Sequence, residues 1–256
     1  MQRVPPVARS LLLGGFATLL AGAPVCAQST QWSDRAFLNI NLGLGLTAKP
    51  FEEHIAPIIY SERAAITAPH EVTGGLTALD VAGGVRVWRS VGVGATYTKL
   101  GRTENVDVAA LVPHPVYFNQ PRAASKVTPL RRTETAVHIQ ALFVVPVTPR
   151  IDLALSGGPS LINISQDFAS GLEVTEGADP FVNVAIGNVR TVTRTGRLVG
   201  VNVGADVTYF LTSLAGVGGT IRYTSSTFAT RQGDGSTIDL SVGGFQVAFG
   251  ARIRFR

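Results

Sequence analysis

Residues 238–256 read I-D-L-S-V-G-G-F-Q-V-A-F-G-A-R-I-R-F-R. From Phe245 onward, aromatic or aliphatic residues alternate with small, polar or cationic ones, which is the period-two pattern of a β-strand with two unlike faces. Such a strand buries its apolar face either against a protein core or against lipid. Gly243 and Gly244 interrupt the alternation, and we expect a β-bulge at that step. The other strands must decide which environment the apolar face meets.

The N-terminus has the features of a secretory signal peptide. Two arginines precede an apolar run at residues 11–23, and Val25-Cys26-Ala27 resembles a small-residue cleavage site. We therefore expect a cleaved signal at residues 1–27 and an exported domain at residues 28–256. The apolar run is shorter than the roughly 20 residues that a spanning helix needs. Because the chain has a single cysteine, within the signal, the exported domain would have no disulfide and no thiol-based site.

Composition excludes several classes of protein. The net charge is +5 with 15% charged residues, and the basic residues are scattered, so we expect no nucleic-acid partner. After the signal no apolar run reaches the about 18 residues that suggest a transmembrane helix. Glycine is abundant, at 28 residues, without a collagen-like period, and glycines inside alternating segments are typical of bulges and curved barrel strands.

Seven further segments alternate as the last one does, so eight strands are predicted. They are residues 37–47, 76–88, 91–100, 132–147, 151–166, 198–210 and 214–228. In the fifth of them the alternation weakens around Gly157-Gly158-Pro159, where we expect a second bulge. The last strand should pair with residues 37–47, because a sheet edge left open cannot persist in hydrocarbon.

The connections between these strands alternate in length. Tight turns are predicted at residues 89–90, 148–150 and 212–213, whereas the other four connections are longer. Within the long connections, residues 61–68 and 181–194 could extend the sheet. An even strand number, with short turns on one rim and longer loops on the other, is typical of a bacterial outer-membrane barrel. The sequence therefore predicts an all-β protein, an eight-stranded antiparallel up-and-down transmembrane β-barrel with four long extracellular loops; a lipocalin-like barrel or a jelly roll is the alternative.

Aromatic residues lie near the predicted strand ends, as interfacial girdles require. They are Phe37, Trp88, Tyr97, Tyr209, Phe210, Tyr223, Phe228 and Phe255.

In its signal peptide, eight strands, loop asymmetry and C-terminal strand, the chain resembles the small outer-membrane β-barrel domain family of the OmpA or OmpX type, found in diderm (Gram-negative) bacteria. The resemblance covers residues 28–256 and rests on this pattern, not on a signature motif. It implies a location in the outer membrane, contact with outer-membrane lipid and lipopolysaccharide, and a monomer. It also implies periplasmic chaperones and the barrel-assembly machinery as partners in biogenesis. In that family a terminal aromatic residue serves as the assembly signal; Phe255 matches it, and this chain differs in adding Arg256.

The strand faces that should point into the barrel carry charges of both signs. The expected lumen network is Asp80, Arg86, Glu134, His138, Gln140, Asp152, Asp206, Arg222, Gln246, Arg252 and Arg254. Buried charges persist only when they are paired and hydrogen-bonded, so these side chains predict an ion-pair plug. A narrow small-solute pore is the alternative, in which the same residues would line the route.

A serine hydrolase is a further alternative. Glu134 and His138 share one strand face but lie about 13 Å apart along it, too far for a direct pair. Ser156 or Ser160 on a neighbouring strand could approach His138, and some outer-membrane lipid A hydrolases use a Ser-His-acid arrangement. However, no G-x-S-x-G motif is present, which favours a histidine packed in the lumen. The other three histidines lie in predicted loops without metal-ligand spacing. We therefore assign no catalytic, cofactor-binding or metal-binding residues, and expect a structural or surface-interaction role with an extracellular ligand at the loops.

Overall fold

The computed structural model describes residues 32–47, 49–70 and 76–256, so the expected signal peptide lies outside the described residues. The described strands are β1 (Ala36–Gly45), β2 (Phe51–Ile55), β3 (Ile58–Ile59), β4 (Glu62–Arg63), β5 (Ala65–His70), β6 (Leu76–Trp88), β7 (Val91–Val112), β8 (Arg122–Thr148), β9 (Ile151–Glu176), β10 (Val184–Phe210), β11 (Ala215–Arg231) and β12 (Thr237–Phe255). Among the described residues there is no helix that is both long and apolar enough to cross a bilayer.

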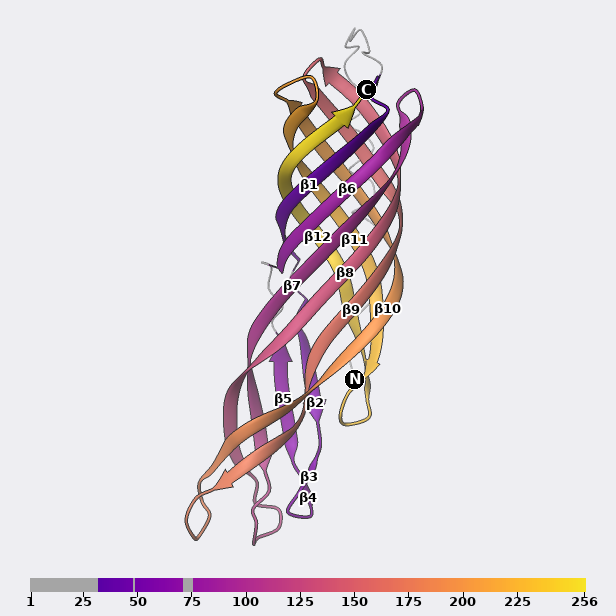
Figure 1. Cartoon of the computed structure of the whole chain (residues 1–256). Helices are drawn as coiled ribbons and strands as arrows, with labels where there is room; N and C mark the ends of the chain where they lie inside the picture. The colour runs from indigo at the N-terminus through magenta and orange to yellow at the C-terminus, as the bar shows by residue number, and fades with distance from the viewer. Residues whose placement is uncertain (1–31, 48, 71–75) are drawn as a thin grey trace, which may run out of the picture.

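Eight of the described strands close into a ring. Their order is β1, β6, β7, β8, β9, β10, β11 and β12, each antiparallel to its neighbours, and β1 closes the ring by pairing with both β6 and β12. Leu38, for example, lies opposite Ile253 on one side and Gly83 on the other. The tilted strands wind around a common axis in Figure 1. The prediction of an eight-stranded antiparallel barrel is confirmed.

The apolar face of each strand lies on the outside at the end that carries the C-terminus. On β12, Phe245, Phe249, Ile253 and Phe255 are exposed. The steps from Phe245 to Phe255, at about 3.3 Å each and a tilt of about 40°, span about 25 Å along the axis, which matches the apolar band of outer-membrane barrels. We call this band the membrane belt.

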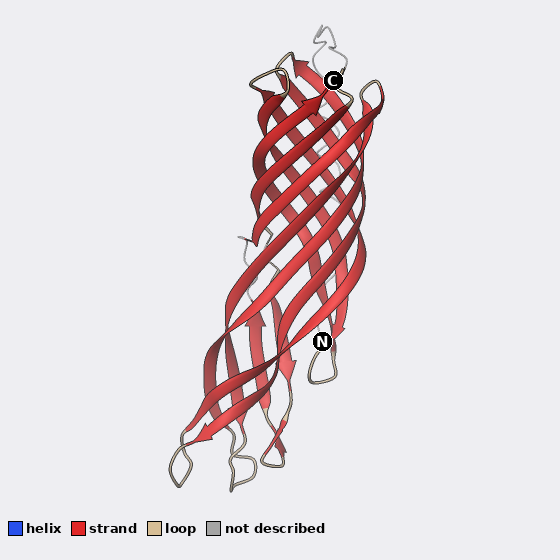
Figure 2. Ribbon diagram, viewed as in Figure 1, coloured by secondary structure: helices blue, strands red, loops and turns tan. Residues whose placement is uncertain are grey.

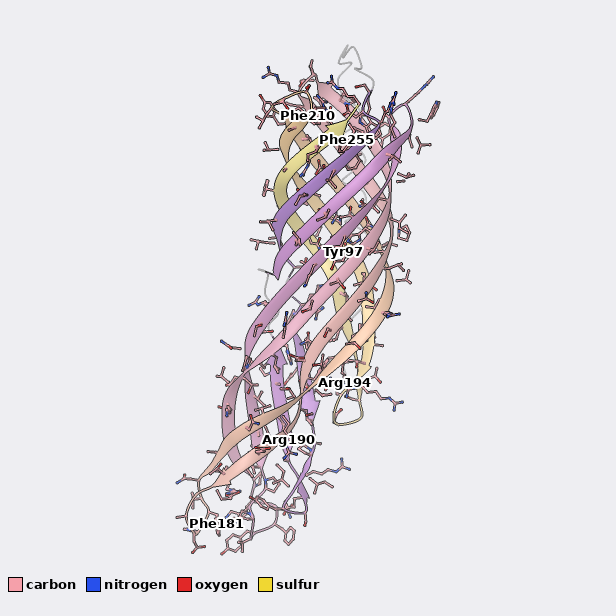
Figure 3. All side chains as sticks on the ribbon, in the orientation of Figure 1. Tyr97, Phe181, Arg190, Arg194, Phe210 and Phe255 are labelled. Carbon is pink, nitrogen blue, oxygen red and sulfur yellow. The ribbon has the colours of Figure 1, made fainter. Side chains whose placement is uncertain are left out.

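Exposed aromatic residues lie at both edges of the membrane belt. Trp88, Tyr209 and Phe255 lie near the rim with the short turns, and Tyr97 and Tyr223 lie at the other edge. Figure 3 shows this separation for Phe255 and Tyr97. The prediction is wrong for three girdle residues: the side chains of Phe210 and Phe228 point inward and are buried, and Phe37 lines an internal cavity near the rim. Their aromatic character near a strand end did not reveal which face they occupy.

Beyond the belt, β7 to β10 continue as a long sheet, drawn at the bottom of Figure 2. The connections that follow the third and fifth predicted strands are shorter than predicted, because only residues 113–121 and 177–183 lie between β7 and β8 and between β9 and β10. The two-residue alternation continues in these strands, but the apolar side chains now lie on the inner face and the polar ones on the outer face. Val106, Val108, Ala110 and Val112 point inward and join a buried apolar cluster with Leu130. We call this part, outside the lipid, the extracellular extension.

The first connection also forms strands. β2 pairs with β5, and β5 pairs with the part of β7 that continues beyond β6. β3 and β4 form a small hairpin. The last connection, between β11 and β12, is only residues 232–236. The extension is therefore a second, soluble-type sheet with its own core, consistent with the predicted sheet extensions at 61–68 and 181–194.

The two expected bulges are corrected by the pairing. Ser160 opposite His138 and Gly157 opposite Ala141 share one register, so the β8–β9 ladder has no bulge at residues 157–159. Gly243 and Gly244 likewise keep register with β11. Their backbone φ values of 92° and 103° instead place a left-handed kink just beyond the point where β1 ends.

Candidate functional site

The centre of the barrel holds a buried carboxylate with three donors. Asp80 accepts hydrogen bonds from Asn41 Nδ2 at 2.8 Å and Thr98 Oγ1 at 3.1 Å, and it pairs with Arg222. Arg222 also donates to Thr98 Oγ1 at 3.1 Å. These side chains come from β1, β6, β7 and β11, so they tie together strands on opposite sides of the ring.

A second ion pair lies next to the first. Arg252 Nη2 contacts Asp206 Oδ2 at 2.6 Å, and its Nη1 donates to Asn41 Oδ1. Thr208 and Thr220 add hydroxyl donors to Asp206. Because Asn41 joins both carboxylate centres, the two ion pairs form one connected network across the lumen.

A layer of amide side chains lies beside this network, and its Gln140 lines the same cavity as Arg222. Gln140 donates through Nε2 to Asn202 Oδ1 at 2.7 Å, and its Oε1 accepts from Thr96 Oγ1 at 2.9 Å. Asn202 Nδ2 donates to Ser160 Oγ at 2.9 Å, and Ser160 Oγ lies 2.7 Å from His138 Nδ1.

The serine and histidine of the hydrolase alternative are therefore in contact, but their surroundings do not suit lipid hydrolysis. Both Ser160 and His138 are completely buried in the lumen. Among the described residues His138 Nε2 has no hydrogen-bond partner, so no acid orients the ring. Glu134 instead contacts Arg132, Lys49 and the backbone N–H of Gly243. A catalytic triad needs the acid on the imidazole and access for the lipid, and neither is present at this dyad.

Glu134 lies at the outer end of the lumen. Arg132 donates to its Oε1 through Nε at 2.8 Å and Nη2 at 2.7 Å, and the backbone N–H of Gly243 donates to Oε2 at 3.0 Å. Lys49 Nζ lies 3.7 Å from Oε1. Arg132 also donates to the Ser241 carbonyl at 2.8 Å, so β8 is linked across the barrel to β12.

The rim with the short turns is filled by residues that precede β1. Arg86 donates to the Trp32 carbonyl at 2.8 Å, and Asp34 lies 3.6 Å from Arg254 Nη1. The Arg254 guanidinium stacks 3.6 Å from the ring centroid of Phe210, a cation–π contact. Trp32 and Asp34 are both buried.

All eleven predicted lumen residues point inward or line the interior. Gln246 is buried opposite Arg222 in the β11–β12 register, and Asp152 lines an internal cavity of about 80 Å³ near the same rim. The sequence analysis missed Asn41, Thr98 and Asn202, although they occupy the same alternating face as predicted members. It also missed Trp32 and Asp34, which lie before the first strand and carry no periodic signal.

The predicted loop histidines do not gather. His70 Nε2 is buried and contacts Glu53 Oε2 at 3.2 Å, and His114 lies in the β7–β8 connection. Within residues 32–47, 49–70 and 76–256 no group of three or more histidine, cysteine, aspartate or glutamate side chains is placed to hold a metal ion.

The far end of the extracellular extension is held by one arginine. Arg122 pairs through both terminal nitrogens with Glu176 and donates to the carbonyls of Pro113 and Phe181. Hydrogen bonding from Arg122 lowers the pKa of the Glu176 carboxyl below its ordinary value. His114 Nδ1 accepts two backbone N–H groups, so its Nε2 carries the proton and donates to the Pro180 carbonyl at 3.1 Å. The two connections are thus clamped to each other.

Apolar side chains are exposed around this clamp. We call them the tip patch: Ile58, Tyr60, Val116, Tyr117, Phe118 and Val182. Figure 3 shows Phe181 at the end farthest from Phe255, and the His114 ring contacts both Phe181 and Tyr117 of the patch. Phe118 and Val182 are 71% and 68% exposed, so they contribute little to the fold of the extension. Exposed apolar clusters on an ordered surface are typical of interaction sites.

Comparison with known proteins adds solved structures of low identity. No protein-family model and no curated protein matches the sequence. Neisserial surface protein A is 11% identical with a TM-score of 0.44, over 86% of this chain and 97% of that one. The outer-membrane protease OmpT from Escherichia coli is 10% identical with a TM-score of 0.45, over 88% and 98%. Ail, the attachment invasion locus protein of Yersinia pestis, is 10% identical with a TM-score of 0.37, over 86% and 99%.

At these scores the likenesses carry no argument about activity, and the assignment stands on the chain's own geometry. The ring is closed, its belt is apolar outside and polar inside, and the three tight turns share one rim. This is the architecture of a bacterial outer-membrane β-barrel, because only a closed barrel satisfies every strand hydrogen bond in lipid. The chain is accordingly an outer-membrane β-barrel protein.

Proposed function

We propose that the barrel anchors a rigid extracellular platform and that the tip patch binds an external protein. The observation that carries this proposal is the extracellular extension itself. Arg122 begins β8 about 15 residues before Val137 at the edge of the belt, which places the tip roughly 35 Å beyond the lipid. A barrel with only a membrane-stabilising role would not require a second sheet of this length.

The extension is ordered by its own interactions. An apolar core containing Ile66, Val108 and Leu130 fills its interior, and Arg122 clamps the two connections at its end. A rigid support lowers the conformational entropy lost on binding, so the exposed tip side chains meet a partner already positioned.

We propose also that the lumen is plugged. The Asp80–Arg222 and Asp206–Arg252 pairs fill its centre. At its outer end lies an apolar cluster that includes Phe168, Phe228 and Leu240. Eight strands leave room for side chains only. Purified protein in planar bilayers should therefore show no steady conductance, and regular single-channel steps would support the pore instead.

The tip proposal is tested with purified barrels in proteoliposomes. Vesicles carrying the wild-type protein are passed over glass coated with individual purified extracellular proteins, with lipid-coated glass as the blank. Phe118→Ser combined with Val182→Ser should abolish retention. Val127→Ser is the matched control, because Val127 is 59% exposed on the side of the extension and away from the tip. The proposal would be refuted if wild-type vesicles were retained on none of the protein coatings, or if vesicles with the tip variant were retained equally well.

The remaining partners are proposals for biogenesis and the membrane. Phe255, exposed at the end of β12, serves as the assembly signal for the barrel-assembly machinery after delivery by periplasmic chaperones. Lipid and lipopolysaccharide surround a monomeric belt. Phe255→Ala should slow the appearance of the heat-modifiable folded band in cells, whereas unchanged assembly would exclude this role. The OmpA or OmpX likeness remains a prediction.

A further inference from the structure

The barrel wall has an opening where β1 ends. β1 stops at Gly45, opposite Gln246, whereas β12 continues outward to Thr237 along β11. Gly243 and Gly244 lie just past that point and have no side chains to fill the wall. A cavity of about 330 Å³ is found here, which we call the seam cavity. This volume lies at the lower end of the range for small-ligand sites.

The seam cavity is lined from both faces of the wall. Arg132 and Thr224 belong to the inward face, and Tyr223 and Ser225 belong to the outward face. The rings of Tyr223 and Phe245 pack at 4.8 Å at the outer edge of the membrane belt. The cavity therefore lies at the level of the lipid headgroups in the outer leaflet.

Three buried donors around the seam cavity have no hydrogen-bond partner among the described residues. They are Lys49 Nζ, Arg132 Nη1 and Thr224 Oγ1. The Lys49 and Arg132 side chains are 6% and 4% exposed. Buried donors are normally satisfied, so three unsatisfied ones lining one cavity indicate a missing acceptor. Glu134 is already bonded by Arg132 and Gly243 and forms a long ion pair with Lys49 Nζ at 3.7 Å, beyond hydrogen-bond distance. The buried Lys49, Arg132 and Glu134 together carry one net positive charge.

We propose that the seam cavity binds a phosphate group held by Lys49, Arg132 and Thr224. Ammonium, guanidinium and hydroxyl donors match the oxygens of a phosphate. Asp239 lines the outer mouth but is exposed, so water screens its charge. The phosphorylated headgroups of outer-leaflet lipid lie at this level, and a free phosphate from outside would have the same chemistry. This inference does not depend on the tip patch.

The test measures binding to the refolded full barrel in detergent by native mass spectrometry. The ligands are diphosphoryl lipid A, the same lipid with its phosphates removed, and inorganic phosphate. Lys49→Gln combined with Thr224→Val removes two of the donors and leaves Arg132 to hold Glu134. Lys126→Gln is the control, because it removes one charge from the extension, where Lys126 bonds the Gly187 carbonyl. Heat-modifiable migration on gels reports folding of every variant.

We expect diphosphoryl lipid A to bind and the double variant to weaken it at least about tenfold, the effect of losing a charge-assisted hydrogen bond. Lys126→Gln should bind as the wild type does. Binding of inorganic phosphate with the same loss in the double variant would support the site and assign it to a free anion. Equal binding of the dephosphorylated lipid, or equal affinity in the folded double variant, would overturn the proposal.

Discussion

Replacing Asp80 with leucine should destabilise the barrel by about 3–5 kcal/mol, the usual cost of leaving a buried charge unpaired. Arg222 is 4% exposed and would lose its carboxylate, while Asn41 and Thr98 would each lose a hydrogen bond to that carboxylate. Adding Arg222→Met should recover about 2–4 kcal/mol, because the unpaired buried charge is then removed from the lumen.

The assay is reversible urea unfolding in detergent micelles, followed by tryptophan fluorescence and by gel migration. Trp32 is buried in the end of the barrel, so its emission should shift to the red on unfolding. Asp107→Leu, at an exposed carboxylate of the extension, is the control and should change the unfolding free energy by less than about 0.5 kcal/mol. A loss below about 1 kcal/mol for Asp80→Leu, or full additivity in the double variant, would refute the coupled network.

Three further outcomes follow from the structure. Phe249→Arg puts a charge in the middle of the membrane belt and should cost about 2–4 kcal/mol in vesicle unfolding experiments; no loss would place this face outside lipid. Gly243→Ala should cost about 1–3 kcal/mol in the same experiment, because φ is 92° and the added Cβ would lie 2.4 Å from the Thr224 carbonyl; a neutral effect would contradict the kink. Amide protection factors from hydrogen exchange at residues 113–121 and 177–183 should stay high from neutral pH down to about pH 4 and fall below it. The sign follows from the lowered pKa of Glu176, whose pairing is kept above its ordinary value of 4.5 and lost as the carboxyl protonates; Arg122→Gln should remove this pH dependence, and fast exchange at pH 7 in the wild type would exclude the clamp.

The membrane strands could be predicted from the sequence because lipid and a polar interior impose opposite chemistry on alternate residues. β6 runs from Leu76 to Trp88, as the alternation predicts, and the three tight turns follow directly from the short gaps between strands. The inward face was equally readable, and all of its predicted charged residues lie inside the barrel. Period two is a local property, so no tertiary information is needed to find it.

The part of the extension formed by β7 and β8 was missed for a physical reason. Val106, Val108, Ala110 and Val112 alternate with other residues as clearly as the belt does, but here the apolar side faces inward. Outside lipid the polarity of a strand reverses, and prolines and asparagines nearby favoured a loop. Alternation alone does not state which face meets which environment.

The partners inside the lumen could not be predicted either. Asp80 meets Arg222 across 142 positions of sequence, and Glu134 meets the backbone of Gly243 across 109. Which side chains meet across the lumen depends on strand tilt and stagger around the closed ring, and no single strand encodes either of them.

The C-terminal segment shows both sides of this division. Its sequence alone determined a β-strand with Phe249 and Ile253 on one face and Arg252 on the other, because successive side chains of a strand point to opposite sides. The tertiary structure decided the rest. Pairing with β1 stops at Gln246, so the glycine kink that seemed a bulge became one wall of a cavity lined by Lys49 and Arg132. Such a site exists only where paired strands of unequal length meet in a closed barrel. The sequence of one strand does not determine where its partner strand ends.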